Sequence, residues 1–182
     1  STLKNGAAGQ ITTSGISSVG MLSAQSTVEN ESGGQITTLG TGSAGVYGTN
    51  DSTITNKGTL TTKETGSAGI YANDSDVTNK STGKITIQKG SSAGIYATST
   101  SMKNVTNDGD IEVGLAGSSE IKGVGIYAGG YQNVEHNGNI NIHMGNSIGI
   151  YGEGENVSIE NKNKITSDAS VSSVIGIMAD KA

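Results

Sequence analysis

Side chains that commonly carry enzyme chemistry are scarce in this sequence. It has no cysteine, tryptophan or arginine, and its two histidines are His136 and His143. They lie seven residues apart across an expected turn with no thiolate beside them, so we expect no metal site. Four aspartates fall at or near expected turns, where aspartate commonly bonds to nearby backbone: Asp74, Asp76, Asp108 and Asp110. The sequence therefore predicts no catalytic residue, no metal ligand and no cofactor.

Carboxylates leave one enzymatic alternative open. Two carboxylates about 5–10 Å apart can hydrolyse a glycosidic bond, and many polysaccharide-degrading enzymes are β-helices. Such enzymes usually line a groove with basic side chains and bulky aromatics, whereas this chain has no arginine and no tryptophan. We expect a non-enzymatic protein, and we keep a carbohydrate-active β-helix of the polysaccharide lyase or glycoside hydrolase kind as the alternative.

Tyrosine is the fifth residue of a six-residue motif that the chain repeats, of which Ser-Ala-Gly-Ile-Tyr-Ala at residues 67–72 is the clearest copy. The tyrosines of the five copies are Tyr47, Tyr71, Tyr96, Tyr127 and Tyr151. Alternation along a strand puts Ala68, Ile70 and Ala72 on the inner face, and Gly69 and Tyr71 on the outer face. An outward row of tyrosines can shield neighbouring strands or, as exposed amphipathic rings, contact sugars or a protein. If this segment binds a partner, we expect the tyrosine row and the loop at residues 114–120 to do so.

Asparagine occupies a second repeated slot, after an apolar residue and before a turn glycine. Its members are Asn5, Asn30, Asn56, Asn79, Asn107 and Asn161. His136 fills the slot in one repeat. Stacked amides at such positions form a ladder in which they bond to each other and to turn backbone. We expect that structural role, with ligand binding as the alternative.

The two motifs recur together at a nearly constant spacing. The glycines of the tyrosine motif are separated by steps of 25, 24, 25, 31, 24 and 27 residues: Gly20, Gly45, Gly69, Gly94, Gly125, Gly149 and Gly176. A fixed period of about 20–50 residues is typical of solenoids. The two longer steps indicate insertions near residues 114–120 and 167–173.

Each repeat contains three short β-type segments, which in the central repeat are residues 68–72, 76–78 and 84–87. One repeat cannot bury its apolar face alone, so successive repeats must stack through parallel strands about 4.8 Å apart. Lys84 and Thr86 should point outward, and Ile85 and Ile87 inward. We predict an all-β, right-handed, single-stranded parallel β-helix of about seven coils over residues 1–182.

Composition restricts the partners. Hydrophobic residues make up 32% of the chain, below the roughly 45–50% of ordinary globular domains, a figure that also counts glycine. The net charge is −5, from 16 acidic residues and 11 lysines, which disfavours nucleic acid and anionic lipid. No apolar run is long enough to cross a bilayer as a helix, so we expect no direct membrane insertion by this segment. Open solenoid ends expose strand edges, which makes end-to-end self-association an expectation.

The paired motifs, Ser-Ala-Gly-Ile-Tyr-Ala and then Val-Thr-Asn-x-Gly-x-Ile-x-Ile, resemble the passenger repeats of large fusobacterial type V autotransporters, the RadD-like outer-membrane adhesins. The resemblance covers essentially the whole chain. It implies a fragment of a long β-helical passenger, held at the outer membrane on the cell surface, that attaches to other bacteria or host cells. The implied partners are surface proteins or glycans of those cells, and the family supplies no catalytic residue. A purely structural spacer is the remaining alternative.

Overall fold

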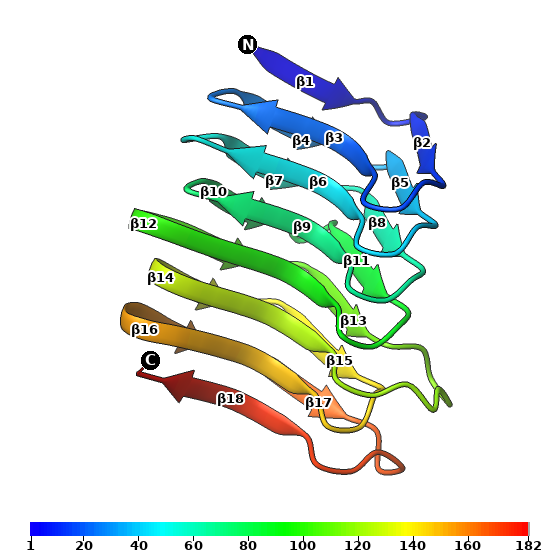
Figure 1. The fold of residues 1–182 in the computed structure, drawn as a ribbon, viewed down its shortest axis with the longest axis vertical. Coiled ribbons are helices and arrows are strands. Elements are labelled where there is room, and N and C mark those ends of the chain that lie inside the picture. The colour runs from blue at the N-terminus through cyan, green and yellow to red at the C-terminus, as the bar shows by residue number, and fades with distance from the viewer. Residues whose placement is uncertain (182) are drawn as a thin grey trace.

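The computed structural model describes residues 1–181, which form 18 β-strands and no helix. All strand pairs are parallel, and each strand pairs with its counterparts about one repeat away in the sequence. The chain winds as a solenoid of about seven turns with its termini at opposite ends (Figure 1). The prediction of a right-handed parallel β-helix is confirmed.

Three faces run along the rod. The tyrosine face consists of β3 (Val19–Ala24), β6 (Ala44–Thr49), β9 (Ala68–Asn73), the first parts of β12 (Ala93–Asn107), β14 (Val124–His136) and β16 (Ile148–Asn161), and β18 (Ile175–Asp180). The asparagine face consists of β1 (Thr2–Asn5), β4 (Thr27–Asn30), β7 (Thr53–Asn56), β10 (Asp76–Asn79) and the second parts of β12, β14 and β16. The threonine face consists of β2 (Gln10–Thr13), β5 (Gln35–Thr38), β8 (Thr59–Thr62), β11 (Lys84–Ile87), β13 (Asp110–Val113), β15 (Asn139–Ile142) and β17 (Lys164–Ser167).

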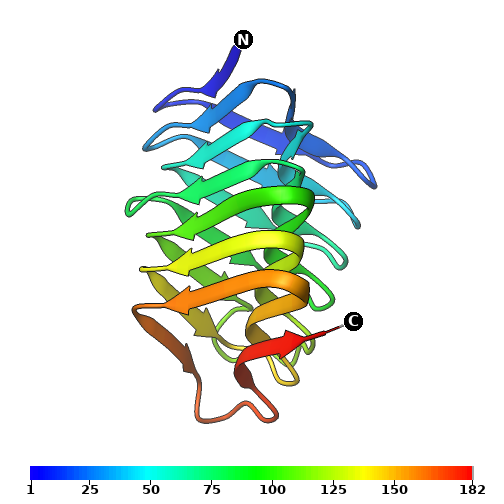
Figure 2. The same cartoon turned by 90° about the vertical axis from the view of Figure 1, so that its left-hand side faces the viewer.

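The first two faces join into one sheet as the rod proceeds. In the early coils a short turn separates them, whereas β12, β14 and β16 run through the corner without a break (Figure 2). The threonine face is a separate seven-stranded sheet. The three segments per coil are therefore present throughout, although three coils fuse two of them into one strand.

Like residues stack on like residues because the register is constant. Tyr71 pairs with Tyr47 and Tyr96, and Asn56 pairs with Asn30 and Asn79. Columns of isoleucine, valine and leucine fill the interior, where Ile85 and Ile87 are fully buried as expected. The interior is thin and aliphatic, which explains how a chain with so few aromatic residues still has a continuous core.

The expected alternation in the tyrosine motif is wrong at its start. Ala68 lines the outer face beside Tyr71, where it is only 7% exposed, and Gly69 faces inward. A Cβ atom at Gly94, the next glycine of this column, would lie 2.6 Å from Cγ2 of the core residue Ile111 and 2.6 Å from the Gly125 carbonyl oxygen. The column needs glycine because backbone and core side chains approach it too closely for any side chain.

The two longer connections are residues 114–123, between β13 and β14, and residues 168–174, between β17 and β18. Glu120 ties the first of them to the coil before it, through an ion pair to Lys89 (2.9 Å) and a hydrogen bond from the Gly90 amide (3.2 Å). Within the described residues there is no helix that is long and apolar enough to span a membrane.

Candidate binding surface

The five tyrosines form one continuous row on the tyrosine face. Successive ring centroids are 4.9, 5.0, 4.5 and 5.5 Å apart from Tyr47 to Tyr151. The rings of Tyr71, Tyr96 and Tyr127 are stacked, with interplanar angles of 22° and 7°, and the two end rings contact the stack edge-on. Because Tyr96 has both ring faces covered by its neighbours, the middle of the row offers ring edges and hydroxyl groups to a partner.

A groove runs beside this row. Its floor is the column that includes Ala44, Ala68, Ala93 and Val124, and the tyrosine rings form one wall. Its two hollows have volumes of about 360 Å³, from Gly66 to Lys122, and about 290 Å³, from Ser17 to Tyr71. Alanine at most floor positions makes the groove, since a larger side chain there would fill it.

The opposite wall is built by residues with a left-handed backbone. One such residue precedes the tyrosine-type segment in each coil, with φ between 50° and 68°, and the first five of them line the groove: Ser17, Gly42, Gly66, Ser91, Lys122, Asn146 and Ser173. This conformation turns the chain sharply from the threonine face onto the tyrosine face. Glycine adopts it freely, and asparagine more readily than other residues with side chains, so the sequence indicates it at Gly42, Gly66 and Asn146.

Beneath this wall lies a ladder of serines that the sequence analysis did not predict. The Ser43 hydroxyl accepts a hydrogen bond from the Ser18 amide (3.1 Å), Ser67 from Ser43 (3.2 Å), and Ser92 from Ser67 (3.1 Å). Each hydroxyl thus occupies a buried backbone donor of the preceding coil. The first serine of the repeated Ser-Ala-Gly-Ile-Tyr motif was the available signal.

Charges are nearly absent from the groove. Lys122 is the one charged residue among those that line its two hollows. On the far side of the tyrosine row, the Tyr127 hydroxyl donates a hydrogen bond to the Glu153 carboxylate. Burial, reinforced by this carboxylate, raises the pKa of Tyr127 far above its ordinary range, and burial also raises the pKa of Tyr71. Tyr71 and Tyr127 therefore stay uncharged across the physiological range.

The 114–120 loop lies beside the groove without forming it. Lys122, just after the loop, lines the groove, whereas Leu115 to Glu120 line a separate hollow of about 480 Å³ with Gln88 and Lys89. Leu115 is exposed at the edge of that hollow. The structure thus places the loop next to the tyrosine surface and gives it a hollow of its own.

The asparagine column is a buried, polarised ladder. The side-chain amide of each asparagine donates to the side-chain oxygen of the next from Asn5 to Asn107, at 2.9, 2.9, 2.8 and 2.7 Å. The same amides donate to the carbonyl of a turn glycine, such as Gly58 at 3.1 Å from Asn56. Every donor points toward the C-terminal end. These residues hold turns together and expose no surface to a ligand.

His136 continues this ladder as the sequence suggests. Its Nδ1 accepts from the Asn107 amide (3.0 Å), and its Nε2–H donates to the Lys164 carbonyl (3.3 Å). Burial lowers the pKa of His136. Asn161 lies in register with His136, but it is exposed and stands beyond the bonded amides.

His143 has the opposite environment. Its two ring nitrogens lie 2.8 Å from Asp168 and 2.9 Å from Glu112. Burial lowers the pKa of His143, but hydrogen bonds to the two carboxylates outweigh it and raise the pKa overall. Within the described residues, no group of three ligating side chains could hold a metal ion.

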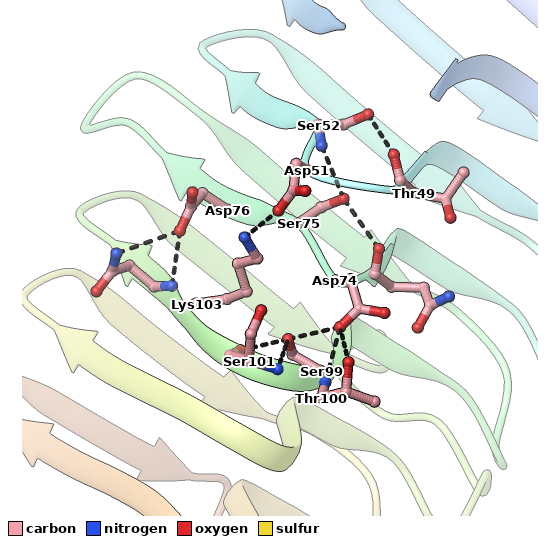
Figure 3. A network of polar contacts seen from close by, with 12 residues as sticks. Thr49, Asp51, Ser52, Asp74, Ser75, Asp76, Ser99, Thr100, Ser101 and Lys103 are labelled. Carbon is pink, nitrogen blue, oxygen red and sulfur yellow. Dashed lines mark hydrogen bonds and ion pairs between the residues drawn. The ribbon is translucent and has the colours of Figure 1, made fainter. Parts of the chain in front are cut away.

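The aspartates between the tyrosine and asparagine faces are engaged in cross-coil contacts (Figure 3). Asp74 accepts from the Thr100 amide (2.7 Å), the Thr100 hydroxyl (3.0 Å) and the Ser99 hydroxyl (2.9 Å), and the first of these bonds lowers the pKa of Asp74 most. Lys103 reaches across two coils to Asp51. This arrangement ties consecutive coils together.

Comparison with known protein families matches residues 23–130 to the family described as the BigA third pectate lyase-like domain. The match covers more than half of the chain. The chain belongs to this family. The BigA-type domain is a pectate lyase-like β-helix of bacterial surface proteins, and that wording states a relation in fold. No curated protein and no solved structure matches the chain.

Proposed function

We propose that this β-helix is a non-enzymatic passenger segment of a bacterial cell-surface adhesin, and that it makes contacts through the tyrosine row and the groove beside it. The observation that carries the proposal is the row itself. Five tyrosines stay in register over five coils, and the four from Tyr47 to Tyr127 line an apolar groove on a face that no other described segment covers (Figure 1). An open groove lined by aromatic edges offers apolar surface and hydroxyl groups to a partner, which supports this proposal over a purely structural spacer.

Membership of a surface-protein family supports a role outside the cell. The resemblance to RadD-like passengers extends the proposal to attachment at the outer membrane, with surface proteins or glycans of other bacteria or host cells as partners. A stiff rod suits that task, because regularly spaced contacts add by avidity although each is weak.

Adhesion is tested with the triple variant Tyr71→Ser, Tyr96→Ser, Tyr127→Ser. We expect binding of the purified chain to partner cells to fall about tenfold or more, because three adjacent aromatic contacts are lost. The matched control is Thr55→Ala, Thr78→Ala, Thr106→Ala, three stacked outward residues of the asparagine face. Equal binding by both folded variants would show that the tyrosines serve stability alone.

The enzymatic alternative has a separate readout. Polysaccharides incubated with the chain should show no new reducing ends and no unsaturated products, because an adhesin leaves its ligand intact. Release of either product, lost in a Glu112→Gln or Asp168→Asn variant, would instead establish a carbohydrate-active enzyme.

A further inference from the structure

We propose that the tyrosine surface pairs with the same surface of a second copy of this chain, with the two rods side by side and pointing in the same direction. This inference rests on the proposed function only in using the same surface, and it names one occupant for the groove. The tyrosine row of each copy would lie in the groove of the other.

Shape and spacing make the surface complementary to itself. A ridge of tyrosine rings lies immediately beside a groove floored by the small residues Ala68 and Ala93. Ridge and groove repeat with the same rung spacing because the same coils build both, about 4.8 Å in a parallel sheet. One tyrosine that fits against an alanine therefore implies that its neighbours fit as well. Few unrelated partners share this spacing.

Symmetry fixes the direction of pairing. A two-fold axis parallel to the rod exchanges the sides of the face, so the ridge of one copy meets the groove of the other. A two-fold axis across the rod keeps the sides and sets ridge against ridge. A pair that fills both grooves therefore has parallel rods, and its interface is isologous.

Charge favours the same arrangement. The chain carries a net charge of −5, yet the groove lining contains no carboxylate, so this face meets its copy with little repulsion. Lys122 stands at the groove edge and Glu153 lies beyond the tyrosine row. Neither forms an ion pair within the described part of the chain.

The parallel pair brings these two charges together. The two-fold axis parallel to the rod places Lys122 of one copy opposite Glu153 of the other copy, in a neighbouring rung. By symmetry the same contact forms a second time, with the two copies exchanged. The Tyr127 hydroxyl uses one oxygen of Glu153, and Glu153 lines a hollow together with Gly129 and Gly154. A lysine side chain can enter there.

Sedimentation velocity of the 182-residue chain tests the pairing. We expect a concentration-dependent dimer with a dissociation constant below about 100 μM, a range typical of weak specific contacts. Ala93→Glu should abolish the dimer by filling the groove floor. Lys122→Glu and Glu153→Lys should each weaken it about tenfold, and the double exchange should restore it because the contact is re-formed with reversed charges. Lys122 is exposed and Glu153 is half-buried outside the core, so the exchange pair tests the contact even where Ala93→Glu impairs folding.

Direction is read from spin labels, because the chain contains no native cysteine. Labels at Thr12→Cys, near one end, or at Thr166→Cys, near the other, should each give a defined distance between copies. In a mixture of the two labelled chains, the mixed pairs should add only a longer distance, because a parallel pair places their labels at opposite ends of the rods. A monomer throughout the concentration series, or a short distance only in the mixture, would overturn the proposal. Cell binding that depends on tyrosine in a monomeric chain would leave the adhesin function standing and remove the pairing alone.

Discussion

His136 and His143 lie on adjacent faces of the same coil, yet their surroundings favour opposite protonation states. His136 is buried with the Asn107 amide donating to its Nδ1, so a proton on that nitrogen would oppose the direction of the whole ladder. His143 lies between Glu112 and Asp168, and it can donate to both only when protonated. Two residues that look equivalent in the sequence thus respond to pH with opposite sign.

The pH dependence of stability should separate them. The unfolded chain protonates His136 near the ordinary pKa of about 6.5, whereas the folded chain resists it, so its contribution is present above that pH and lost as pH falls. His143 has a raised folded pKa, so its contribution is full below about pH 6.5 and lost as pH rises through the folded value.

The measurement is the free energy of unfolding in urea at pH 5 and pH 8. Relative to the unsubstituted chain, His136→Asn should shift the difference between the two values toward greater stability at pH 5. His143→Gln should shift it toward greater stability at pH 8. Shifts of the same sign in both variants would contradict the two environments described here.

At the scale of the element, equivalent strand positions of successive coils form a column, and the residue types that a column tolerates differ between the middle and the ends of the rod. The inward glycine column of the tyrosine face has no room at Gly94, whereas a Cβ atom at Gly176 would meet nothing within 4 Å. The asparagine column shows the same contrast between buried Asn79 and exposed Asn161.

Gly94→Ala should destabilise the chain by about 1–3 kcal/mol, the usual cost of overpacking. Gly176→Ala, in the same column with a normal backbone, should change stability little. Urea unfolding measures both variants. Equal effects would mean that the glycines are needed for backbone conformation and not for space.

Asn79→Ala should cost about 1–3 kcal/mol, because it leaves buried partners in the ladder without their hydrogen bonds. Asn161→Ala, in the same column beyond the bonded amides, is its control and should be close to neutral. Loss of amide protection in hydrogen exchange near Gly83 would locate the effect. A neutral Asn79→Ala variant would show that the ladder adds no stability.

At the scale of the whole molecule, each coil contacts mainly its two neighbours, so stability should add coil by coil. Deletion of residues 69–93 removes one complete coil and joins Ala68 to Gly94 in the register that the strands already use. The shortened chain should fold, and its denaturant m-value should fall by roughly one seventh, because m scales with the surface exposed on unfolding. An unfolded product would show that the coils are not interchangeable.

The sequence by itself determined the winding, the three segments per coil, the outward tyrosines and the asparagine slot. These follow from the repeat period, which stacks equivalent residues of successive coils on one another. The local sequence pattern therefore predicts the global fold. Ala68 and Gly69 were misplaced because the chain turns through a left-handed residue just before the motif, and at Ser91 or Lys122 nothing in the residue type announces that turn. Only the tertiary structure decided that the tyrosine rings cover each other's faces and border a groove, since both depend on how side chains from different coils meet.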